Sequence, residues 1–392
     1  MNILFLFENA IVPHIGGVQR VTHILAEELL SRGHKVAFLS IAEDPAKYDY
    51  QYIAPQYFID CKKDKEPIKE EYEKILEKEN VDIVINQEPR PDTHYLLSIT
   101  PESVKKITCL HIQPFCTQNF GRMMLKYMKC NNWKELLYVS FCRLFPAYYL
   151  KQTLNIETAR LNKSLEVSDY LCFLSEKFIP RVLKYMPTVE KKRLVAVNNP
   201  ATFEFLKTNE QTKEKTIIWV GRQSNSPKNI PAFIDVWKII SKSNKDWKAI
   251  IIGDGGDLEY NKKYAQKNAV ERLKFAGLQK DVEQFYQKAS LIGMTSTYEG
   301  WGMVLTEAMS YGCIPFAYDT YESVHDIIDD NKNGIIVKPF NKKEMAMRIQ
   351  ELIDDKEKFT AMQKAAIEKV KEFSVENIVD KWEKILDYNH TI

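Results

Sequence analysis

The chain has 392 residues, of which 45% are hydrophobic and 28% charged, a composition that suits one large or two ordinary globular domains with a buried core. Lys and Arg number 55 against 53 Asp and Glu. The overall charge therefore gives no indication of a nucleic-acid partner, and any basic binding surface must be local.

The cysteines and the N-terminus both bear on the cellular compartment. Seven cysteines are an odd number and form no C-x-x-C pair, which favours free thiols in a reducing compartment. The opening MNILFLFENA has no basic leader, and its run of five apolar residues before Glu8 is too short for a signal peptide or a membrane span. We therefore expect a cytoplasmic protein.

Short apolar runs alternate with helical patterns in the first half of the chain. Residues 2–7 and 35–41 are typical of buried strands, and residues 18–31 between them have apolar side chains at helical spacing. Gly33 follows the last helical turn, where a left-handed residue is favoured. These elements predict a parallel βαβ unit. The same alternation continues through apolar runs at 81–86, 107–111 and 170–174.

A second series of apolar runs begins after VNNPAT, a turn-rich stretch from Val197 that is typical of a linker. We expect two doubly wound α/β domains, residues 1–197 and 198–374, and a last helix in 375–392 that returns to the first domain. No repeat of 20 to 50 residues indicates a solenoid. The runs of the second series are 216–220, 247–252, 273–275, 290–295, 314–317 and 334–337.

Ligands of open parallel sheets bind outside the carboxyl ends of the strands, so the strand-to-helix loops carry the candidate functional residues. After the first strand, HIGGVQR places Gly16 and Gly17 before a helix, where bare N–H groups and the positive dipole end favour an anion. A tight turn that lets the helix start is the alternative.

Two further loops follow strands of the second domain. VGRQSNSPKN holds Arg222 and Lys228, and a planar guanidinium with a compact ammonium suits a diphosphate, whereas solvated surface charge is the alternative. IIGDGGDLE ends a strand at Gly253 but lacks the G-x-G-x-x-G spacing of a dinucleotide loop. Close backbone packing explains these glycines equally well.

The stretch YEGWGMVLTEAMSYG frames a Gly-Trp-Gly step with Glu299 and Glu307. The preceding strand ends before Glu299, and helical spacing from Met303 places Glu307 about one turn inside a helix. Two carboxylates beside uncovered helix-start N–H groups suit a polyhydroxylated or anionic ligand, because carboxylates accept hydroxyl hydrogen bonds. The alternative is a solvated Glu299 and a Glu307 that caps a surface helix.

Taken together, these motifs resemble the retaining family-4 glycosyltransferases, whose GT-B fold has two Rossmann-like domains facing across a cleft. The resemblance runs from GGVQR and LLSRGHKVAFLS through TCLH, VGR with PKN, and GDG to FAGLQKDVEQFYQKASLIGMTSTYEGWGMVLTEAMSYGCIP. Glu299 and Glu307 have the spacing of the family's E-x7-E signature, and the offset of six from Arg222 to Lys228 also matches.

The resemblance implies roles for the charged residues. Arg222 and Lys228 would bind the diphosphate of a nucleotide-sugar donor and stabilise its charge as the glycosidic bond breaks. Glu307 would accept hydrogen bonds from the ribose hydroxyls. Glu299, catalytic like Arg222 and Lys228, would meet hydroxyls of the transferred sugar, helped by backbone at Gly300, Trp301, Gly302 and Met303.

It also implies roles for uncharged positions. Gly16 and Gly17 resemble the loop that closes on the donor phosphates, and His111, at the end of CLH, resembles a catalytic histidine near the donor sugar. A satisfied buried imidazole is the alternative for His111. Gly253 joins the donor-binding positions, and the backbone around Phe275 and Gly277 resembles the segment that recognises the base, although Phe275 could equally be core.

The implied reaction needs neither cofactor nor metal, and it retains the sugar's configuration. We expect a UDP-sugar donor, with GDP-mannose next, and a hydroxyl acceptor on a lipid-linked or polysaccharide intermediate. Where family members often have Asn-Gly-Val-Asp, this chain has NNPA from Asn198, which alters the hinge. A nucleotide-sugar epimerase, a non-catalytic binding subunit and an NAD-dependent enzyme are the weaker alternatives.

Residues 122–151 differ in composition from the rest of the first half. They hold six basic residues, one acid (Glu135) and seven aromatics, among them Trp133, Tyr148 and Tyr149. Such a segment suits an interfacial helix pair on the anionic inner face of a membrane, or uptake of a lipid-linked acceptor. Helices whose aromatics pack on the sheet while lysines face water are the alternative.

Overall fold

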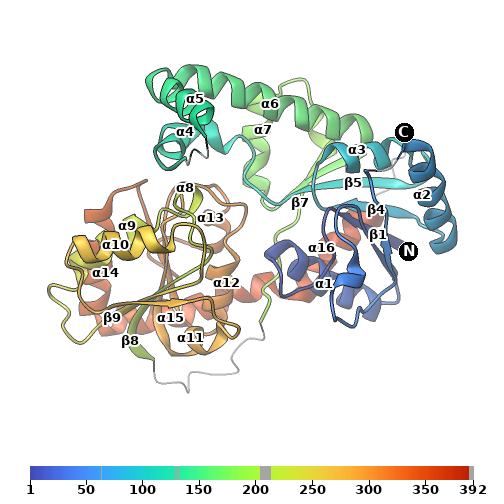
Figure 1. The fold of residues 1–392 in the computed structure, drawn as a ribbon. Helices are drawn as coiled ribbons and strands as arrows, with labels where there is room; N and C mark the ends of the chain where they lie inside the picture. Colours follow the sequence, from blue (N-terminus) through green and yellow to red (C-terminus); the bar gives the residue numbers. More distant parts are fainter. Residues whose placement is uncertain (63, 129, 131, 204–212, 388–392) are drawn as a thin grey trace. The chain divides into compact units, whose positions relative to one another are not determined.

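The computed structural model describes residues 1–62, 64–128, 130, 132–203 and 213–387. The chain divides into two compact units, each with its own parallel sheet (Figure 1). The first unit contains Met1–Pro114, Asn155–Thr202 and the chain from Phe373 onward, and the second contains Phe115–Leu154 and Phe203–Glu372.

The sheet of the first unit has the strand order β3-β2-β1-β4-β5-β6-β7, and every described pairing in it is parallel. The first strand lies inside the sheet, and later strands add on both sides of it, as in a doubly wound fold. The strands are β1 (Asn2–Phe7), β2 (Lys35–Ser40), β3 (Gln56–Phe58), β4 (Ile83–Asn86), β5 (Lys105–Leu110), β6 (Tyr170–Phe173) and β7 (Leu194–Ala196).

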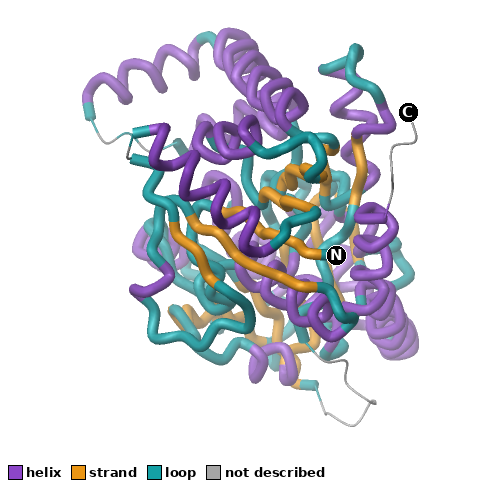
Figure 2. Tube along the Cα trace, turned by 90° about the vertical axis from the view of Figure 1, so that its right-hand side faces the viewer, coloured by secondary structure: helices purple, strands orange, loops and turns teal. Residues whose placement is uncertain are grey.

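Helices connect these strands along the chain. Figure 2 draws helices in purple and strands in orange. One face of the sheet packs Leu4, Leu39 and Val84 against helix side chains such as Tyr72 and Leu96. The helices are α1 (Gly17–Ser31), α2 (Lys65–Glu79), α3 (Pro91–Ile99), α6 (Pro146–Val167), α7 (Ile179–Tyr185) and α16 (Val375–Asp387), with 3-10 turns at Pro45–Lys47, Glu176–Phe178, Lys191–Arg193 and Lys371–Phe373.

The sheet of the second unit repeats this plan with the order β10-β9-β8-β11-β12-β13, again parallel in every described pairing. The expected fold class of two Rossmann-like α/β units is therefore confirmed. The strands are β8 (Glu214–Val220), β9 (Lys248–Ile252), β10 (Leu273–Gly277), β11 (Ala289–Met294), β12 (Ile314–Tyr318) and β13 (Ile335–Val337).

Large buried side chains form the core of the second unit. Trp219 and Phe316 of the sheet pack with Phe233 and Trp237 of α9. The helices of this unit are α4 (Cys116–Tyr127), α5 (Trp133–Leu144), α8 (Asn225–Lys228), α9 (Ile230–Ile240), α10 (Leu258–Lys267), α11 (Glu283–Lys288), α12 (Met303–Ser310), α13 (Val324–Ile327), α14 (Lys342–Asp354) and α15 (Lys356–Val370).

The helical segment Phe115–Leu154 differs from the domain division expected from the sequence. It was expected in the domain of residues 1–197, yet it groups with the second unit. The cause is packing that sequence order does not reveal, because α4 contacts α8 and the ring of Phe120 lies 5.5 Å from that of Phe340. The segment consists of α4, α5 and the start of α6, and we call it the helical arm.

The end of α1 follows the local rule that the sequence suggests. Gly33 has φ of 86°, the left-handed conformation, and its N–H donates to the Leu30 carbonyl at 3.0 Å. The His34 N–H donates to the Leu29 carbonyl, also at 3.0 Å. These two bonds satisfy carbonyls at the helix terminus and turn the chain into β2.

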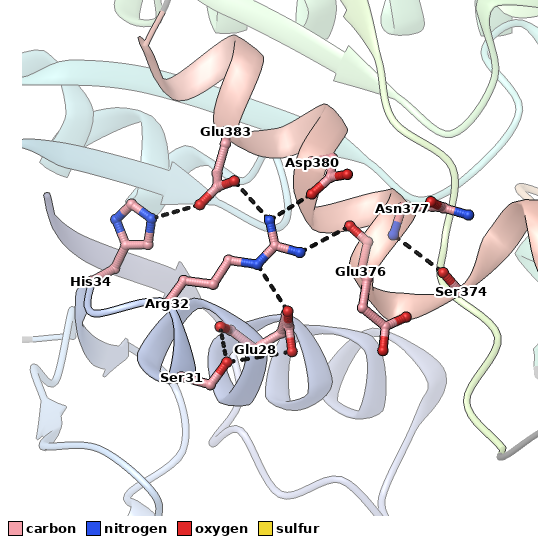
Figure 3. Close-up of polar contacts among 9 residues, drawn as sticks. All are labelled: Glu28, Ser31, Arg32, His34, Ser374, Glu376, Asn377, Asp380 and Glu383. Carbon is pink, nitrogen blue, oxygen red and sulfur yellow. Dashed lines mark hydrogen bonds and ion pairs between the residues drawn. The ribbon is translucent and has the colours of Figure 1, made fainter.

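The last described helix, α16, packs against α1 within the first unit. Arg32 at the end of α1 donates to Glu28 at 2.8 Å, to Asp380 at 2.6 Å and to Glu383 at 2.7 Å (Figure 3). His34 lies 3.0 Å from the second oxygen of Glu383, and hydrogen bonds from these two residues lower the pKa of the Glu383 carboxyl. The network fixes the C-terminal helix to the N-terminal one.

Among the described residues, no helix is long and apolar enough to cross a membrane.

Candidate functional site

The candidate site of the second unit lies where the direction of strand addition reverses. β8 and β11 are neighbours in the sheet, and the chain leaves them toward opposite edges. Ligands of open α/β sheets bind at such a switch point. The two loops are tied together, because the Thr297 N–H donates to the Pro227 carbonyl at 2.6 Å and the Thr295 hydroxyl to the Asn229 carbonyl at 3.1 Å.

Lys228 and Glu299 meet across these two loops. Their Nζ and Oε1 atoms are 2.6 Å apart, and the side chains are 23% and 14% exposed. The Ser296 hydroxyl donates to the same Glu299 oxygen at 2.6 Å. Lys228 was expected in a loop, but it ends α8, a single helical turn, and Asn229 follows in the left-handed conformation with φ of 45°. The turn fixes where the ammonium points.

Arg222, on the same loop as α8, has an exposed side chain. Among the described residues, no carboxylate lies within ion-pair distance of its guanidinium. Burial raises the pKa of Tyr298 to about 12, and the positive charge of Arg222 partly offsets this rise. An accessible, uncompensated guanidinium on the loop that also carries a partly buried ammonium suits an anionic ligand with several oxygens.

Glu307 is buried on α12, with 5% of its surface exposed. The Tyr286 hydroxyl donates to its Oε2 at 2.8 Å and so fixes the carboxylate. Gly302 precedes α12 with φ of 105°, a conformation that favours glycine. Glu299 in the loop and Glu307 one turn into the helix thus have the placement expected from the sequence.

The backbone from Gly300 to Met303 connects the two acids. The Trp301 side chain is 2% exposed, so its indole is core and a ligand could meet this residue through its backbone. The Gly300 carbonyl accepts a hydrogen bond from the Ser323 hydroxyl at 2.9 Å, and this bond links the Gly-Trp-Gly segment to the chain after β12. The Gly302 and Met303 N–H groups belong to the start of α12, where the helix dipole favours negative charge.

The glycines of the neighbouring strands have a structural reason. Gly253 has φ of 120°, and a Cβ there would lie 2.0 Å from the Gly221 carbonyl oxygen. The Gly253 N–H donates to the Gly277 carbonyl at 2.7 Å, which pairs the ends of β9 and β10. Phe275 on β10 packs against the core of the unit. Close backbone packing accounts for Gly253, and its role toward a ligand stays a prediction.

A cavity of about 290 Å³ lies beside the loop that follows β8. Gln223, Ser224 and Ser226 line it from that loop, and Tyr127 and Met128 line it from the end of α4. The Gln223 amide donates to the Gly253 carbonyl at 3.0 Å, so the loop end is held to the end of β9. The helical arm therefore forms one wall of the cavity beside the loop that follows β8.

The remaining predicted site residues belong to the first unit. His111 follows β5, and its Nε2 donates to Gln87 Oε1 at 2.6 Å. Burial lowers the pKa of His111 to about 4, so the imidazole is neutral at pH 7, with Nδ1 as its unprotonated nitrogen. Gly16 precedes α1 in extended conformation, and Gly17 is the first helical residue and is exposed.

Four polar partners of these residues were not singled out in the sequence. They are Gln87 beside His111, Ser296 and Tyr298 around Glu299, and Tyr286 beside Glu307. The sequence could have indicated Gln87, because it directly follows β4 and β4 pairs with β5, the strand that precedes His111. No sequence pattern pointed to Tyr286, which comes from the short helix α11.

Among the described residues, no group of three or more His, Cys, Asp or Glu side chains is placed to hold a metal ion. The absence of a metal or cofactor in the reaction stays a prediction.

The second unit matches a known family. Residues 201–369 fit the model described as glycosyl transferases group 1. This range contains Arg222, Lys228, Glu299 and Glu307 and ends near the close of α15.

Two curated relatives are glycosyltransferases. Over 376 residues, 95% of this chain and 96% of the relative, the chain is 23% identical to an uncharacterized glycosyltransferase of Haemophilus influenzae. Over 198 residues, 50% of this chain and 55% of the relative, it is 25% identical to a Campylobacter jejuni protein. The latter is named GalNAc-alpha-(1->4)-GalNAc-alpha-(1->3)-diNAcBac-PP-undecaprenol alpha-1,4-N-acetyl-D-galactosaminyltransferase.

A solved structure extends the likeness to the whole fold. A mutant of S. aureus TarM in complex with Fondaparinux, alpha-GlcNAc-glycerol and UDP has a TM-score of 0.72 and 14% identity, and the match covers 99% of this chain and 100% of TarM. The two parallel-sheet units thus have the GT-B fold. The family model and the curated relatives support the assignment of the chain as a glycosyltransferase.

Proposed function

We propose that the chain is a retaining glycosyltransferase that moves a sugar from a nucleotide diphosphate sugar to a hydroxyl group of an acceptor. The observation that carries the proposal is the Lys228–Glu299 pair at 2.6 Å, held by two loops at the switch point of the second sheet. A cation and an acid so close together match the two parts of the donor, the diphosphate and the sugar hydroxyls.

The proposed roles follow from charge and exposure. Arg222 and Lys228 bind the diphosphate and stabilise the negative charge that grows on it as the bond to the anomeric carbon breaks. Because Ser296 also donates to Glu299, that carboxylate is held in place while its other oxygen remains available for a sugar hydroxyl. Glu307, fixed by Tyr286, accepts hydrogen bonds from the ribose.

In the proposed reaction, the acceptor oxygen forms a bond to the anomeric carbon on the face from which the nucleoside diphosphate leaves. The acceptor proton passes to an oxygen of the leaving diphosphate, so the products are the glycoside and the free nucleoside diphosphate. The neutral His111 contributes a hydrogen bond to the donor sugar. Gly16 and Gly17 leave backbone N–H groups that can bind the phosphates of the nucleotide-sugar donor.

A UDP-sugar is the favoured donor, and GDP-mannose is the second choice. TarM is similar to this chain and was solved with UDP. For the acceptor we propose a lipid-linked or growing polysaccharide intermediate, because the name of the C. jejuni relative describes an undecaprenol-linked oligosaccharide.

The test begins with thermal unfolding against a panel of nucleotide sugars, because a ligand that binds the folded form alone raises the midpoint. Donor cleavage is then followed by NMR, which reads the anomeric configuration of the transferred sugar. We expect one donor to raise the midpoint, and its sugar to keep its configuration. Inversion of configuration would contradict the retaining mechanism, and release of an isomerised sugar without transfer would indicate an epimerase.

The site is tested by Arg222→Ala, with Lys364→Ala, an exposed cation on α15, as the matched control. We expect Arg222→Ala to lower donor turnover by two to three orders of magnitude, roughly the effect of removing a group that stabilises transition-state charge. The control should leave turnover unchanged. If Arg222→Ala binds and cleaves the donor normally, the assignment of this loop is wrong.

A further inference from the structure

The helical arm presents an unusual amount of apolar surface to solvent. Of the sixteen exposed large apolar side chains among the described residues, eight lie between residues 133 and 148. Trp133 is 67% exposed, Leu137 61% and Leu144 77%. Isolated exposed apolar residues are ordinary, but contiguous patches mark interaction surfaces.

The buried side of α5 explains why so much of it faces outward. Cys142 packs with Leu125 and Tyr149 in a small cluster, and Val139 is the other buried residue of the helix. This inner contact uses one narrow stripe. The aromatic side chains of α5 are therefore not packed on a sheet, which removes the alternative in which they are ordinary core residues.

The exposed side chains form one strip. Trp133, Leu137, Phe141 and Leu144 follow one another at intervals of three or four, which places them on one side of α5. The ring of Phe141 lies 4.9 Å from that of Phe145 and 5.3 Å from that of Tyr148, so the strip continues into the start of α6. We call it the arm face.

Cations surround a hollow next to the arm face. A cavity of about 650 Å³ is lined by Arg122, Lys126 and Arg143 together with Leu125, Leu144 and Pro146. Arg143 also donates to the Leu125 carbonyl at 3.0 Å, which holds its guanidinium at the rim. No carboxylate is among these lining residues. The hollow pairs positive charge with apolar side chains, as a phosphate with a hydrocarbon tail requires.

The one acid of residues 122–151, Glu135, caps a helix. Glu135 accepts from the Asn132 amide at 2.9 Å and serves the N-terminal cap of α5. A second copy of the chain is a poor occupant, because a twofold contact through the arm face would bring the two cation sets together. An anionic surface gains from both the charge and the apolar strip.

We infer that the arm face docks on an anionic phospholipid leaflet, with Trp133, Leu137 and Leu144 entering the headgroup boundary and Arg122 and Lys126 contacting lipid phosphates. The docking does not depend on the proposed reaction. It does bear on it, since α4 of the same arm contacts α8, which carries Lys228. A glycosyltransferase docked in this way would meet a lipid-linked acceptor at the membrane surface.

The inference is tested by co-sedimentation of the full-length chain with vesicles of phosphatidylcholine alone and of phosphatidylcholine with phosphatidylglycerol. We expect binding to the anionic vesicles that weakens as salt is added, because salt screens charge contacts at a surface. Absence of binding to either vesicle would overturn the inference. Equal binding to both vesicles at all salt concentrations would overturn the role of the cations and so the inference as stated.

Two pairs of variants separate the two contributions. Arg122→Gln with Lys126→Gln should weaken binding to anionic vesicles by up to about thirtyfold, since each basic residue near such a surface contributes roughly fivefold. Trp133→Ala with Leu137→Ala should weaken it at least tenfold, roughly the effect of exposing one large apolar side chain. All four side chains lie on the surface, and circular dichroism checks that the variants fold.

Matched controls carry the same changes elsewhere. Ile239→Ala with Met347→Ala removes two exposed apolar side chains, 42% and 54% exposed, and Lys358→Gln with Lys364→Gln removes two exposed cations. Both controls should bind vesicles like the parent chain. If the parent is a dimer by light scattering and the Trp133 and Leu137 changes make it a monomer without altering vesicle binding, the arm face is a contact between copies and the inference is wrong.

Discussion

The two sheets have the same plan, but the loops after their first strands differ in chemistry. After β1 comes a glycine step, and α1 begins at Gly17 without a side-chain cap. After β8 comes a loop with Arg222 and a one-turn helix that ends at Lys228. The comparison teaches that the sheet fixes where a ligand can bind in each unit, whereas the loop residues decide whether that place carries charge.

The difference extends to the other predicted site residues. In the first unit, His111 is neutral at pH 7 because burial lowers its pKa to about 4. In the second unit, the acids Glu299 and Glu307 have partners within 2.8 Å. We therefore expect changes of charge in the second unit to affect turnover most, and changes in the first unit to have smaller effects.

Lys228→Ala should have the largest effect. The change removes the ammonium and leaves Glu299 with the Ser296 hydroxyl as partner. We expect donor turnover to fall because about 3 to 4 kcal/mol of transition-state stabilisation is lost. Steady-state kinetics measure the loss, and Lys364→Ala is the control. A decrease of less than threefold would mean that the pair is a structural contact.

Gly253→Ala and Gly16→Ala separate two glycines with the same predicted role. A Cβ at Gly253 would meet the Gly221 carbonyl oxygen at 2.0 Å, whereas one at Gly16 would meet the flexible end of Gln19 at 2.6 Å. We expect Gly253→Ala to lower the free energy of unfolding by about 3 kcal/mol, and Gly16→Ala to leave it nearly unchanged. Urea titration measures both. Equal stability losses would contradict the structural difference.

Glu307→Gln tests whether the negative charge of the buried acid is needed, because glutamine has nearly the same shape. The amide oxygen can still accept from Tyr286, but the negative charge is lost, so donor affinity should fall about tenfold, or roughly 1.4 kcal/mol. Calorimetric titration with the donor measures this effect. Tyr286→Phe should weaken binding by a smaller factor, since it removes the group that positions Glu307. Unchanged affinity in both variants would exclude Glu307 from the donor site.

The last prediction is a pH dependence of stability in the first unit. The pKa of His111, about 4 in the folded chain, lies below its ordinary value near 6.5, so the unfolded chain takes up the proton first. Stability should therefore fall by about 1 to 2 kcal/mol as the pH drops from 6.5 to 4. His111→Gln should reduce this slope in urea titrations at each pH. A slope identical to that of the parent chain would show that other groups cause it.

Much of the fold could be predicted from the sequence because buried parallel strands leave continuous apolar runs. The run at residues 2–7 coincides with β1, and those at 35–41 and 314–317 match β2 and β12 within one residue. The strands that were missed, Gln56–Phe58 and Leu194–Ala196, are three residues long and lie at the two edges of their sheet. So short a run carries little periodicity.

The candidate site could be predicted in part. The strand-end rule indicated the loops of Arg222, Lys228 and Glu299, and the structure joins the last two in an ion pair. The partner of Glu307 could not be predicted, because Tyr286 comes from a helix whose packing depends on the tertiary fold. The grouping of the helical arm with the second unit could not be predicted for the same reason, since α4 and its contact partner α8 are far apart in the sequence.

The interleaving of the two units has a consequence for dissecting the protein. The chain passes between them four times, after Pro114, Leu154, Thr202 and Glu372. No single cut yields two intact pieces, and a fragment that stops at residue 197 would carry the helical arm without α8 and lack α16. Half-proteins made for separate study should therefore be spliced from several segments, and gene fusions that exchange one half should move the arm with the C-terminal portion.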